Sequence, residues 1–141
     1  MVGTPRHSVS VAGIVVDESG RVLVIRRRDN GHWEPPGGVL ELDETPEEGV
    51  RREVLEETGT SVEVTHLTGV YKNMRRGVVA LVYRCVPLTI PTQATAEATE
   101  VRWMTLDEVR RAMSPAYAVR VTDAFEPHPR TRAHDGTDLL P

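Results

Sequence analysis

Two segments near the start of the chain change from alternating to continuous apolar character. Residues 8–16 (SVSVAGIVV) alternate first and then become apolar, as a strand does when it enters a core. Residues 21–27 (RVLVIRR) form a second apolar run. The polar residues 17–20 (DESG) provide a turn between them, so we expect the two strands to form a hairpin.

The second half of the chain predicts three more strands. Residues 62–71 and 77–87 have strand-like patterns and are joined by a basic turn, residues 72–76 (KNMRR). Residues 97–104 (EATEVRWM) predict a short strand that follows an acidic loop.

Two helices and a polar tail are predicted to follow. Thr105 and Glu108 form a capping box for a helix that runs to about Met113. Ser114-Pro115 begins another helix that ends near Phe125. Residues 126–141 contain mainly Pro, His, Arg, Asp and Gly, so we expect one domain over residues 1–125 and a disordered tail over 126–141.

The most strongly specified element is a central helix. Thr45 is a good N-cap, Pro46 suits the first helical position, and Glu48 completes a capping box. Gly59 can adopt the left-handed conformation that ends a helix. The sequence therefore predicts a helix from residue 46 to residue 58, directly after the turn-forming residues 35–38 (PPGG).

Acidic residues are concentrated in this region. Eight of the 21 acidic residues lie between residues 41 and 57. Glu53, Glu56 and Glu57 are spaced i, i+3 and i, i+4, so their carboxylates share one helix face, where like charges weaken a helix by a few tenths of a kcal/mol per pair. A bound cation would neutralise them, and a set of oxygen ligands suits Mg²⁺ or Mn²⁺ better than zinc.

Composition narrows the class of protein. The 141 residues fit one domain, and the formal net charge of −4 argues against stable nucleic-acid binding. The sequence has no apolar run of the ~20 residues that a membrane span needs, and no apolar core of a signal peptide. Cys85 is the single cysteine, which fits a reducing compartment, and we expect a cytoplasmic protein in which Cys85 is a buried small hydrophobe.

The acidic segment, residues 38–60, resembles the signature of the Nudix hydrolases. That signature is Gly, five residues, Glu, seven residues, then Arg-Glu-apolar-any-Glu-Glu-any-Gly-apolar. This chain departs from the usual form at Thr60, where an aliphatic residue is common, and at Asp43, where a glycine often stands. The matching positions are Gly38, Glu44, Arg52, Glu53, Val54, Glu56, Glu57 and Gly59.

The resemblance, which covers residues 8 to 125, implies an α/β/α sandwich with a mixed β-sheet. It also implies a Mg²⁺-dependent hydrolase that splits a nucleoside diphosphate linked to another group X. The implied metal ligands are the carboxylates of Glu53, Glu56 and Glu57 and the backbone carbonyl of Gly37 or Gly38.

The resemblance also implies roles for residues around these ligands. A glutamate in the loop before the last strand adds a metal ligand or acts as the base, and we prefer Glu97 to Glu100 because Glu100 adjoins the strand. Glu56 and Glu97 both remain candidates for the base. The Arg52–Glu44 pair braces the loop against the helix, and with Gly38 and Gly59 it belongs to the structural part of the motif.

Two arginines are candidates for binding the substrate's phosphates. A guanidinium binds phosphate bidentately, and the resemblance favours Arg27 over its neighbours, although a solvated strand end is an alternative reading. Arg75 lies in the basic turn, where the alternative is a solvated hairpin loop.

The sequence constrains the identity of the substrate less than it constrains the type of reaction. ADP-ribose-cleaving members often have a proline where Arg75 stands, which favours a nucleoside triphosphate, including an oxidised one, cleaved to the monophosphate and pyrophosphate. ADP-ribose or another nucleotide sugar stays open, as does a module that senses nucleotides without cleaving them. An edge strand that pairs with its own copy would give a homodimer.

Overall fold

The computed structural model describes residues 3–92 and 94–141. Four strands come before a central helix, three strands follow it, and two helices and a last strand complete the described part of the chain. The elements are β1 (Ser8–Val15), β2 (Val22–Arg27), β3 (Trp33–Glu34), β4 (Gly37–Val39), α1 (Pro46–Thr58), β5 (Val62–Asn73), β6 (Val78–Pro87), β7 (Ala98–Met104), α2 (Leu106–Ala112), α3 (Pro115–Asp123) and β8 (Arg130–His134).

The strands form two sheets. The larger sheet has the order β4-β1-β6-β5-β8, and the smaller has the order β3-β2-β7. In the larger sheet β1 runs parallel to β6 and β5 runs parallel to β8, whereas the remaining neighbours are antiparallel. The larger sheet is therefore mixed, as the sequence predicted.

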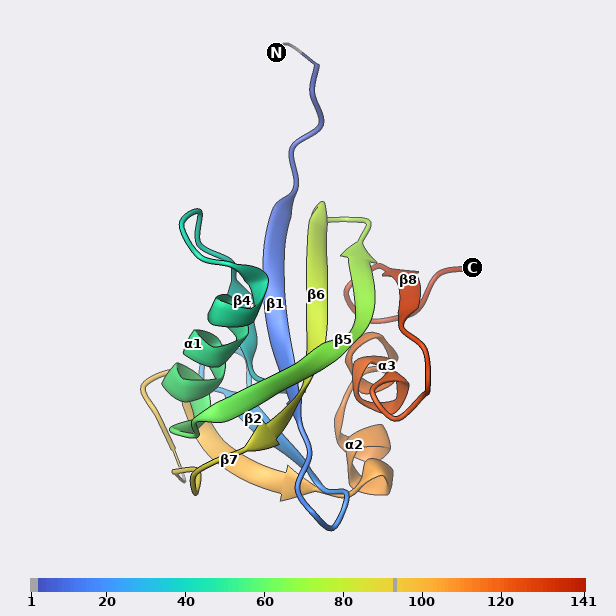
Figure 1. Cartoon of the computed structure of the whole chain (residues 1–141). Helices are drawn as coiled ribbons and strands as arrows, with labels where there is room; N and C mark the ends of the chain where they lie inside the picture. The colour runs from blue at the N-terminus through green and yellow to red at the C-terminus, as the bar shows by residue number, and fades with distance from the viewer. Residues whose placement is uncertain (1–2, 93) are drawn as a thin grey trace.

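The helices lie on both sides of the strands. Figure 1 shows α1 on one side and α2 with α3 on the other. One buried cluster packs α1 against β1 and β6 through Val50, Val54 and Cys85, and a second packs α2 and α3 against the strands around Tyr71. This arrangement confirms the predicted α/β/α sandwich, and Cys85 is buried as expected.

The caps of α1 are formed as the sequence predicted. The Thr45 side chain accepts a hydrogen bond from the Glu48 backbone N–H, and the Glu48 side chain accepts one from the Thr45 backbone. Gly59 ends the helix with φ of 73°, in the left-handed region, and its N–H donates to the Leu55 carbonyl. Both ends of the helix are thus specified by residues within or next to it.

The predicted hairpin of the first two strands is wrong. β1 lies between β4 and β6 in the larger sheet, whereas β2 lies between β3 and β7 in the smaller one. An isolated antiparallel bridge between Val16 and Val22 closes the turn that joins them, but the pairing does not continue along the two strands. The apolar run of β1 is buried and pairs along both edges, and an apolar pattern does not specify which strands will be its partners.

The expectation of a disordered tail is also wrong. β8 pairs with the edge of β5, so the folded unit continues beyond residue 125. Arg132 donates to both oxygens of Asp123 at 2.7 and 2.9 Å, and Asp123 also accepts from the Tyr71 hydroxyl at 2.8 Å. The segment has few apolar residues, but backbone pairing and buried polar contacts order it.

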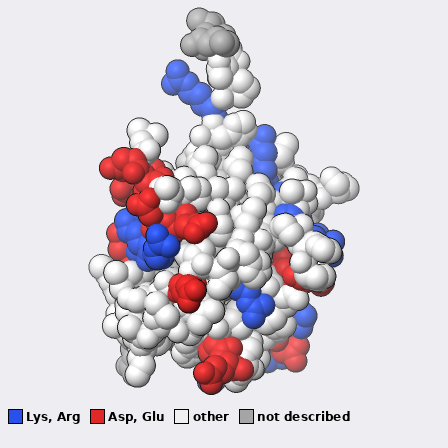
Figure 2. All heavy atoms as spheres, viewed as in Figure 1, with Lys and Arg blue, Asp and Glu red and all other residues white. Residues whose placement is uncertain are grey.

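None of the helices among the described residues is long and apolar enough to cross a membrane. On the face shown in Figure 2, acidic side chains gather over α1 and the loop before it, next to arginines. On this face, the largest group of acidic side chains therefore lies at the helix that the sequence marked out, with smaller charged groups elsewhere.

Asp123 joins α3, β5 and the C-terminal strand, so its removal should destabilise the fold. We expect Asp123→Ala to lower the free energy of unfolding by about 3 kcal/mol, because it leaves the buried Tyr71 hydroxyl without its acceptor and Arg132 without its carboxylate. Urea unfolding measures the change, with Arg130→Ala, an exposed residue of the same strand, as the control. A loss below about 1 kcal/mol would show that the C-terminal segment adds little to the fold.

Candidate active site

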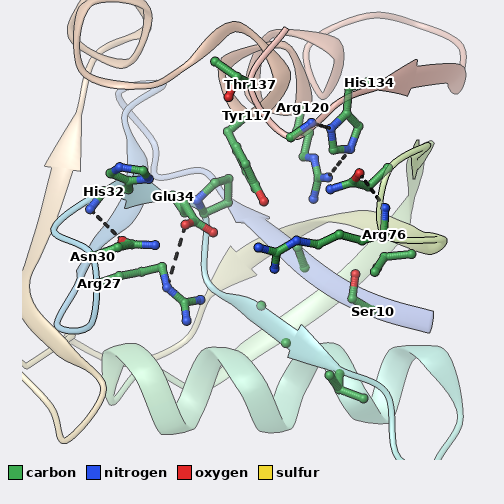
Figure 3. A pocket seen from close by; sticks show the side chains of 18 of the residues that line it. Ser10, Arg27, Asn30, His32, Glu34, Arg76, Tyr117, Arg120, His134 and Thr137 are labelled. Carbon is green, nitrogen blue, oxygen red and sulfur yellow. Dashed lines mark hydrogen bonds and ion pairs between the residues drawn. The ribbon is translucent and has the colours of Figure 1, made fainter. Parts of the chain in front are cut away.

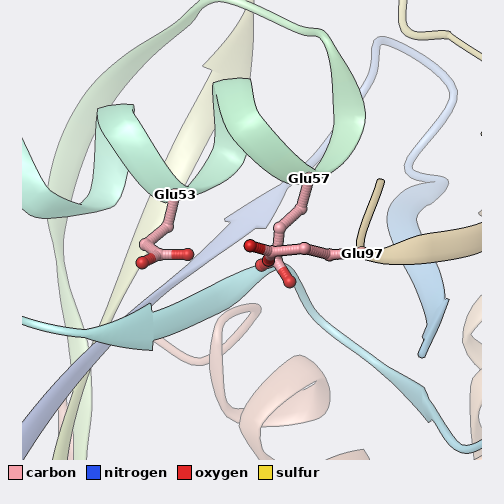
Figure 4. A group of neighbouring side chains, drawn as sticks. All are labelled: Glu53, Glu57 and Glu97. Atoms are coloured by element: carbon pink, nitrogen blue, oxygen red, sulfur yellow. The ribbon is translucent and has the colours of Figure 1, made fainter. Parts of the chain in front are cut away.

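Three carboxylates converge at one end of α1. Glu53 and Glu57 come from successive turns of the helix, and their side chains are buried, with exposed fractions of 7% and 2%. Glu97 reaches them from the loop before β7 (Figure 4). One oxygen from each of the three residues lies within 4.8 Å of the others. The structure therefore brings together three of the four predicted carboxylates.

The glycine turn before α1 fits closely against this cluster. The Gly37 N–H donates to Glu57 Oε1 at 2.6 Å. A Cβ atom on Gly38 would lie 2.6 Å from the Glu53 carboxyl carbon, so any side chain there would displace that carboxylate. The absence of side chains at both positions lets the backbone of β4 pass directly beside the two glutamates.

Arg52 holds the start of the cluster in place. Its guanidinium donates to Glu44 at 2.6 and 2.9 Å, to Glu53 at 2.8 Å, and to the Val39 carbonyl at 3.1 Å. The hydrogen bonds from Arg52 lower the pKa of Glu44 to about 2. Arg52 and Glu44 thus tie the loop before α1 to the helix.

Glu56 is placed apart from the cluster. Its side chain is 48% exposed, and its carboxylate lies 3.3 Å from Arg52 Nη1. The other acidic alternative, Glu100, pairs with Arg26 and Arg102 on β2 and β7. Glu97 thus joins the group of oxygens within 4.8 Å, whereas Glu56 lies outside that group and shares the contact with Arg52 Nη1 that Glu53 makes at 2.8 Å.

Burial and mutual repulsion act on the clustered carboxylates. The pKa of Glu57 is raised to about 8, first by burial and then by the charges of Glu53 and Glu97, against the opposing hydrogen bond from Gly37. Burial also raises the pKa of Glu53, and Arg52 opposes this. A divalent cation would favour the charged forms, and the donor atoms are all oxygens, so the cluster fits Mg²⁺ or Mn²⁺.

A cleft of about 550 Å³ begins beside the cluster and extends along β1 to the C-terminal segment. Gly37, Gly38 and Arg27 line the end next to the carboxylates. Tyr117 of α3 and His134 of β8 line the far part (Figure 3). This volume lies within the range of small-molecule sites in proteins.

The two predicted phosphate-binding arginines both line this cleft. Arg27 donates to both oxygens of Asp29, at 2.9 and 2.7 Å, and its Nε lies 3.8 Å from a Glu34 oxygen. Arg75 lies on the exposed turn between β5 and β6, next to Arg76. Arg27 is therefore held close to the carboxylates, whereas Arg75 lines the cleft from the turn between β5 and β6.

Sequence reasoning missed several residues of the cleft. Glu34, Tyr117, Arg120 and His134 come from β3, α3 and β8, and no local motif marks any of them. They become neighbours only because β8 adds to the edge of β5 and α3 packs beneath it. The sequence contained no signal that could have found them.

Comparison with known proteins agrees with this geometry. A family model described as NUDIX domain matches residues 6–125. The chain belongs to the Nudix hydrolase family. A crystal structure of a NUDIX hydrolase from Nitrosomonas europaea superimposes with a TM-score of 0.78 at 22% identity, over 95% of this chain and 83% of the other. That likeness confirms the Nudix fold.

Relatives with similar sequences have several names. A protein of Streptomyces ambofaciens named MutT-like is 60% identical over 138 residues, which are 97% of this chain and 90% of the relative. An 8-oxo-dGTP diphosphatase of Proteus vulgaris is 41% identical over 40% of this chain and 53% of its own length. An ADP-ribose pyrophosphatase of Methanocaldococcus jannaschii is 42% identical over 49% of this chain and 42% of its own length.

The raised pKa of Glu57 predicts a pH dependence of stability in the metal-free Nudix domain. Between the ordinary value of 4.5 and the folded value of about 8, the folded state binds a proton that the unfolded state has released. Stability should therefore fall as the pH rises from about 5 to about 8, by up to about 1.4 kcal/mol per pH unit from this one group.

Glu57→Gln should remove this contribution, because glutamine does not titrate. Urea unfolding in chelator at several pH values measures it, and Glu47→Gln, an exposed change on the same helix, is the control. An unchanged pH dependence in Glu57→Gln would show that this carboxyl is not perturbed.

Proposed function

We propose that this Nudix pyrophosphohydrolase hydrolyses a nucleoside triphosphate to the monophosphate and pyrophosphate in a Mg²⁺-dependent reaction. The observation that supports it most is the convergence of Glu53, Glu57 and Glu97 at the end of a cleft large enough for a nucleotide. Carboxylates in this arrangement attract cations, and the adjoining arginines attract phosphates.

Glu53, Glu57 and Glu97 are the ligands we assign to the metal, with Mn²⁺ as an alternative ion. Bound there, the ion would neutralise phosphate oxygens and lower the pKa of a water molecule. Glu53 is oriented by Arg52 and Glu57 by the Gly37 N–H, so these two carboxylates are held ready for a cation. The Gly37 carbonyl remains a candidate ligand.

Hydrolysis forms a bond from the water oxygen to phosphorus and breaks the bond from that phosphorus to the leaving pyrophosphate, which takes the bonding electrons. The water must also lose a proton to a base. We assign this role to Glu97, because it is exposed and lies at the cluster, whereas Glu56 lies against Arg52. Of the two candidates for the base, we therefore propose Glu97 rather than Glu56.

Arg27 and Arg75 are assigned to the substrate's phosphates. Arg27 lines the cleft beside Gly37 and also borders a smaller hollow that contains Glu57 and Glu97. Arg75 and Arg76 add positive charge to the lining of the same cleft. Phosphates bound by Arg27 would lie next to the carboxylates, because Arg27 shares the smaller hollow with Glu57 and Glu97.

The names of the relatives support two substrate classes. The MutT-like relative matches nearly the whole chain, and a shorter match is named 8-oxo-dGTP diphosphatase, which favours a nucleoside triphosphate. A second short match is named ADP-ribose pyrophosphatase, so a nucleotide sugar is the second candidate. Arg75, where a proline is common in ADP-ribose-cleaving members, supports the first.

Incubating the protein with Mg²⁺ and nucleoside triphosphates, nucleotide sugars and ADP-ribose, with product analysis, would test this proposal. We expect triphosphate turnover with release of pyrophosphate. Glu97→Gln should lower kcat by about 10²- to 10⁴-fold with little change in KM, as for loss of a general base. Glu100→Gln, a surface change on the adjacent strand, should leave kcat within about twofold.

Other outcomes would contradict the proposal in distinct ways. Cleavage of ADP-ribose without triphosphate turnover would assign the nucleotide-sugar class. Nucleotide binding with no turnover of any compound would indicate a sensing module. Full activity of Glu97→Gln would exclude Glu97 as the base.

A further inference from the structure

Arg120 is a buried cation at the far end of the cleft. Only 7% of the residue is exposed, yet it lines the cleft. Within the described parts of the chain, its guanidinium has no carboxylate within 4.0 Å, and its Nε atom is buried without a hydrogen-bond partner. A buried charge with no carboxylate in contact is unfavourable, and a ligand group that accepts its hydrogen bonds would compensate it.

Aromatic rings compensate part of the charge. The guanidinium carbon lies 4.6 Å from the centre of the Tyr117 ring and 5.1 Å from that of Tyr71. Contacts with ring faces attract a cation but accept none of its N–H groups in a strong hydrogen bond. The N–H edge of Arg120 is therefore the part that lacks acceptors.

His134 adds a second donor at the same place. The Gly136 N–H donates to His134 Nδ1 at 2.9 Å, so the proton of the neutral ring must be on Nε2. Burial and the neighbouring Arg120 charge lower the pKa of His134, which favours the neutral ring. Nε2 lies 3.2 Å from Arg120 Nη2, and both atoms are then donors. Two donors converge where one acceptor atom would satisfy both.

Glu34 supplies an acceptor in the same cleft. It lies on β3, and burial raises its pKa while the charges of Arg27 and Arg120 lower it. In Figure 3 the Tyr117 ring projects between Glu34 on one side and Arg120 with His134 on the other. The cleft thus presents the two donors at its far end, the Glu34 acceptor next to Arg27, and an aromatic ring between them.

We propose that Arg120, His134 and Glu34 bind the edge of an oxo nucleobase, in which a ring carbonyl stands next to a ring N–H. The carbonyl oxygen accepts from Arg120 and His134, and the ring N–H donates to Glu34. Guanine, hypoxanthine and uracil have this edge. Adenine and cytosine present an amino group instead of the carbonyl, which would place a third donor against the two of the protein.

The inference depends on the proposed function only in that the ligand is a nucleotide. Its measurable consequence is a preference between bases. Paired hydrogen bonds to a base edge discriminate by about 1–3 kcal/mol, which corresponds to about 5- to 150-fold in affinity. Hypoxanthine lacks the 2-amino group of guanine but retains the edge, so the two should bind alike.

Calorimetric binding of GMP, IMP and AMP without metal tests this directly. We expect GMP and IMP to bind with similar affinity and AMP to bind about 5- to 150-fold more weakly. Arg120→Gln should bring the GMP-to-AMP affinity ratio close to one. Arg76→Gln, the matched control at the cleft opening, should weaken all three ligands equally and keep the ratio.

A second variant, Glu34→Ala, tests the inference independently if Arg120→Gln does not fold. Glu34→Ala should weaken GMP and IMP but not AMP, because it removes the acceptor for the ring N–H. Equal affinity for GMP and AMP in the wild type, or an unchanged ratio in Glu34→Ala, would overturn the inference.

The result also separates the two proposals. Turnover of triphosphates with no base preference would support the proposed function and exclude the oxo-base site. Selective binding of GMP and IMP without turnover of GTP or ITP would support the oxo-base site and exclude the proposed activity.

Discussion

The site depends on the burial of two like charges of one helix against a glycine turn. Glu53 and Glu57 are both buried, although each carboxylate would be better solvated in water. The arrangement is held because Arg52 pairs with Glu53, the Gly37 N–H pairs with Glu57, and the capped ends of α1 fix the register of the helix. The repulsion that remains is what makes the cluster receptive to a cation.

The two ends of the cleft differ in charge. Carboxylates gather at the end beside α1, whereas the far end contains a buried guanidinium and a neutral histidine. The nucleotide that we propose as substrate matches this order, because a cation bound by the carboxylates would attract its phosphates and the donors at the far end would face its base. The same cleft can therefore hold the reacting group at one end and read the base at the other.

The sequence predicted those parts of the structure that local interactions determine. Both ends of α1 follow from Thr45 and Gly59, and the approach of Glu53 to Glu57 follows from helical spacing. Glu97 could be proposed only through the Nudix resemblance, because its approach to the helix depends on the path of the loop before β7. Spacing alone also grouped Glu56 with the other two, but its side chain is 48% exposed and lies outside the group of three carboxylates, on the Arg52 guanidinium that also contacts Glu53.

Long-range strand pairing explains what the sequence could not predict. The apolar pattern of β1 did not show that β1 would pair with β4 and β6 rather than with β2. The composition of residues 126–141 did not show that β8 would pair with the edge of β5. The far end of the cleft depends on that last pairing, since β8 brings His134 to Arg120. Residues that have no local motif thus form the far end of the cleft.

Anomalous diffraction from crystals soaked in Mn²⁺ would test the cation site most directly. We predict a manganese peak within coordination distance of Glu53, Glu57 and Glu97, with Arg52 still bound to Glu44. Manganese held by Glu56 with Glu97 turned away, or no peak at these carboxylates, would contradict the site described here.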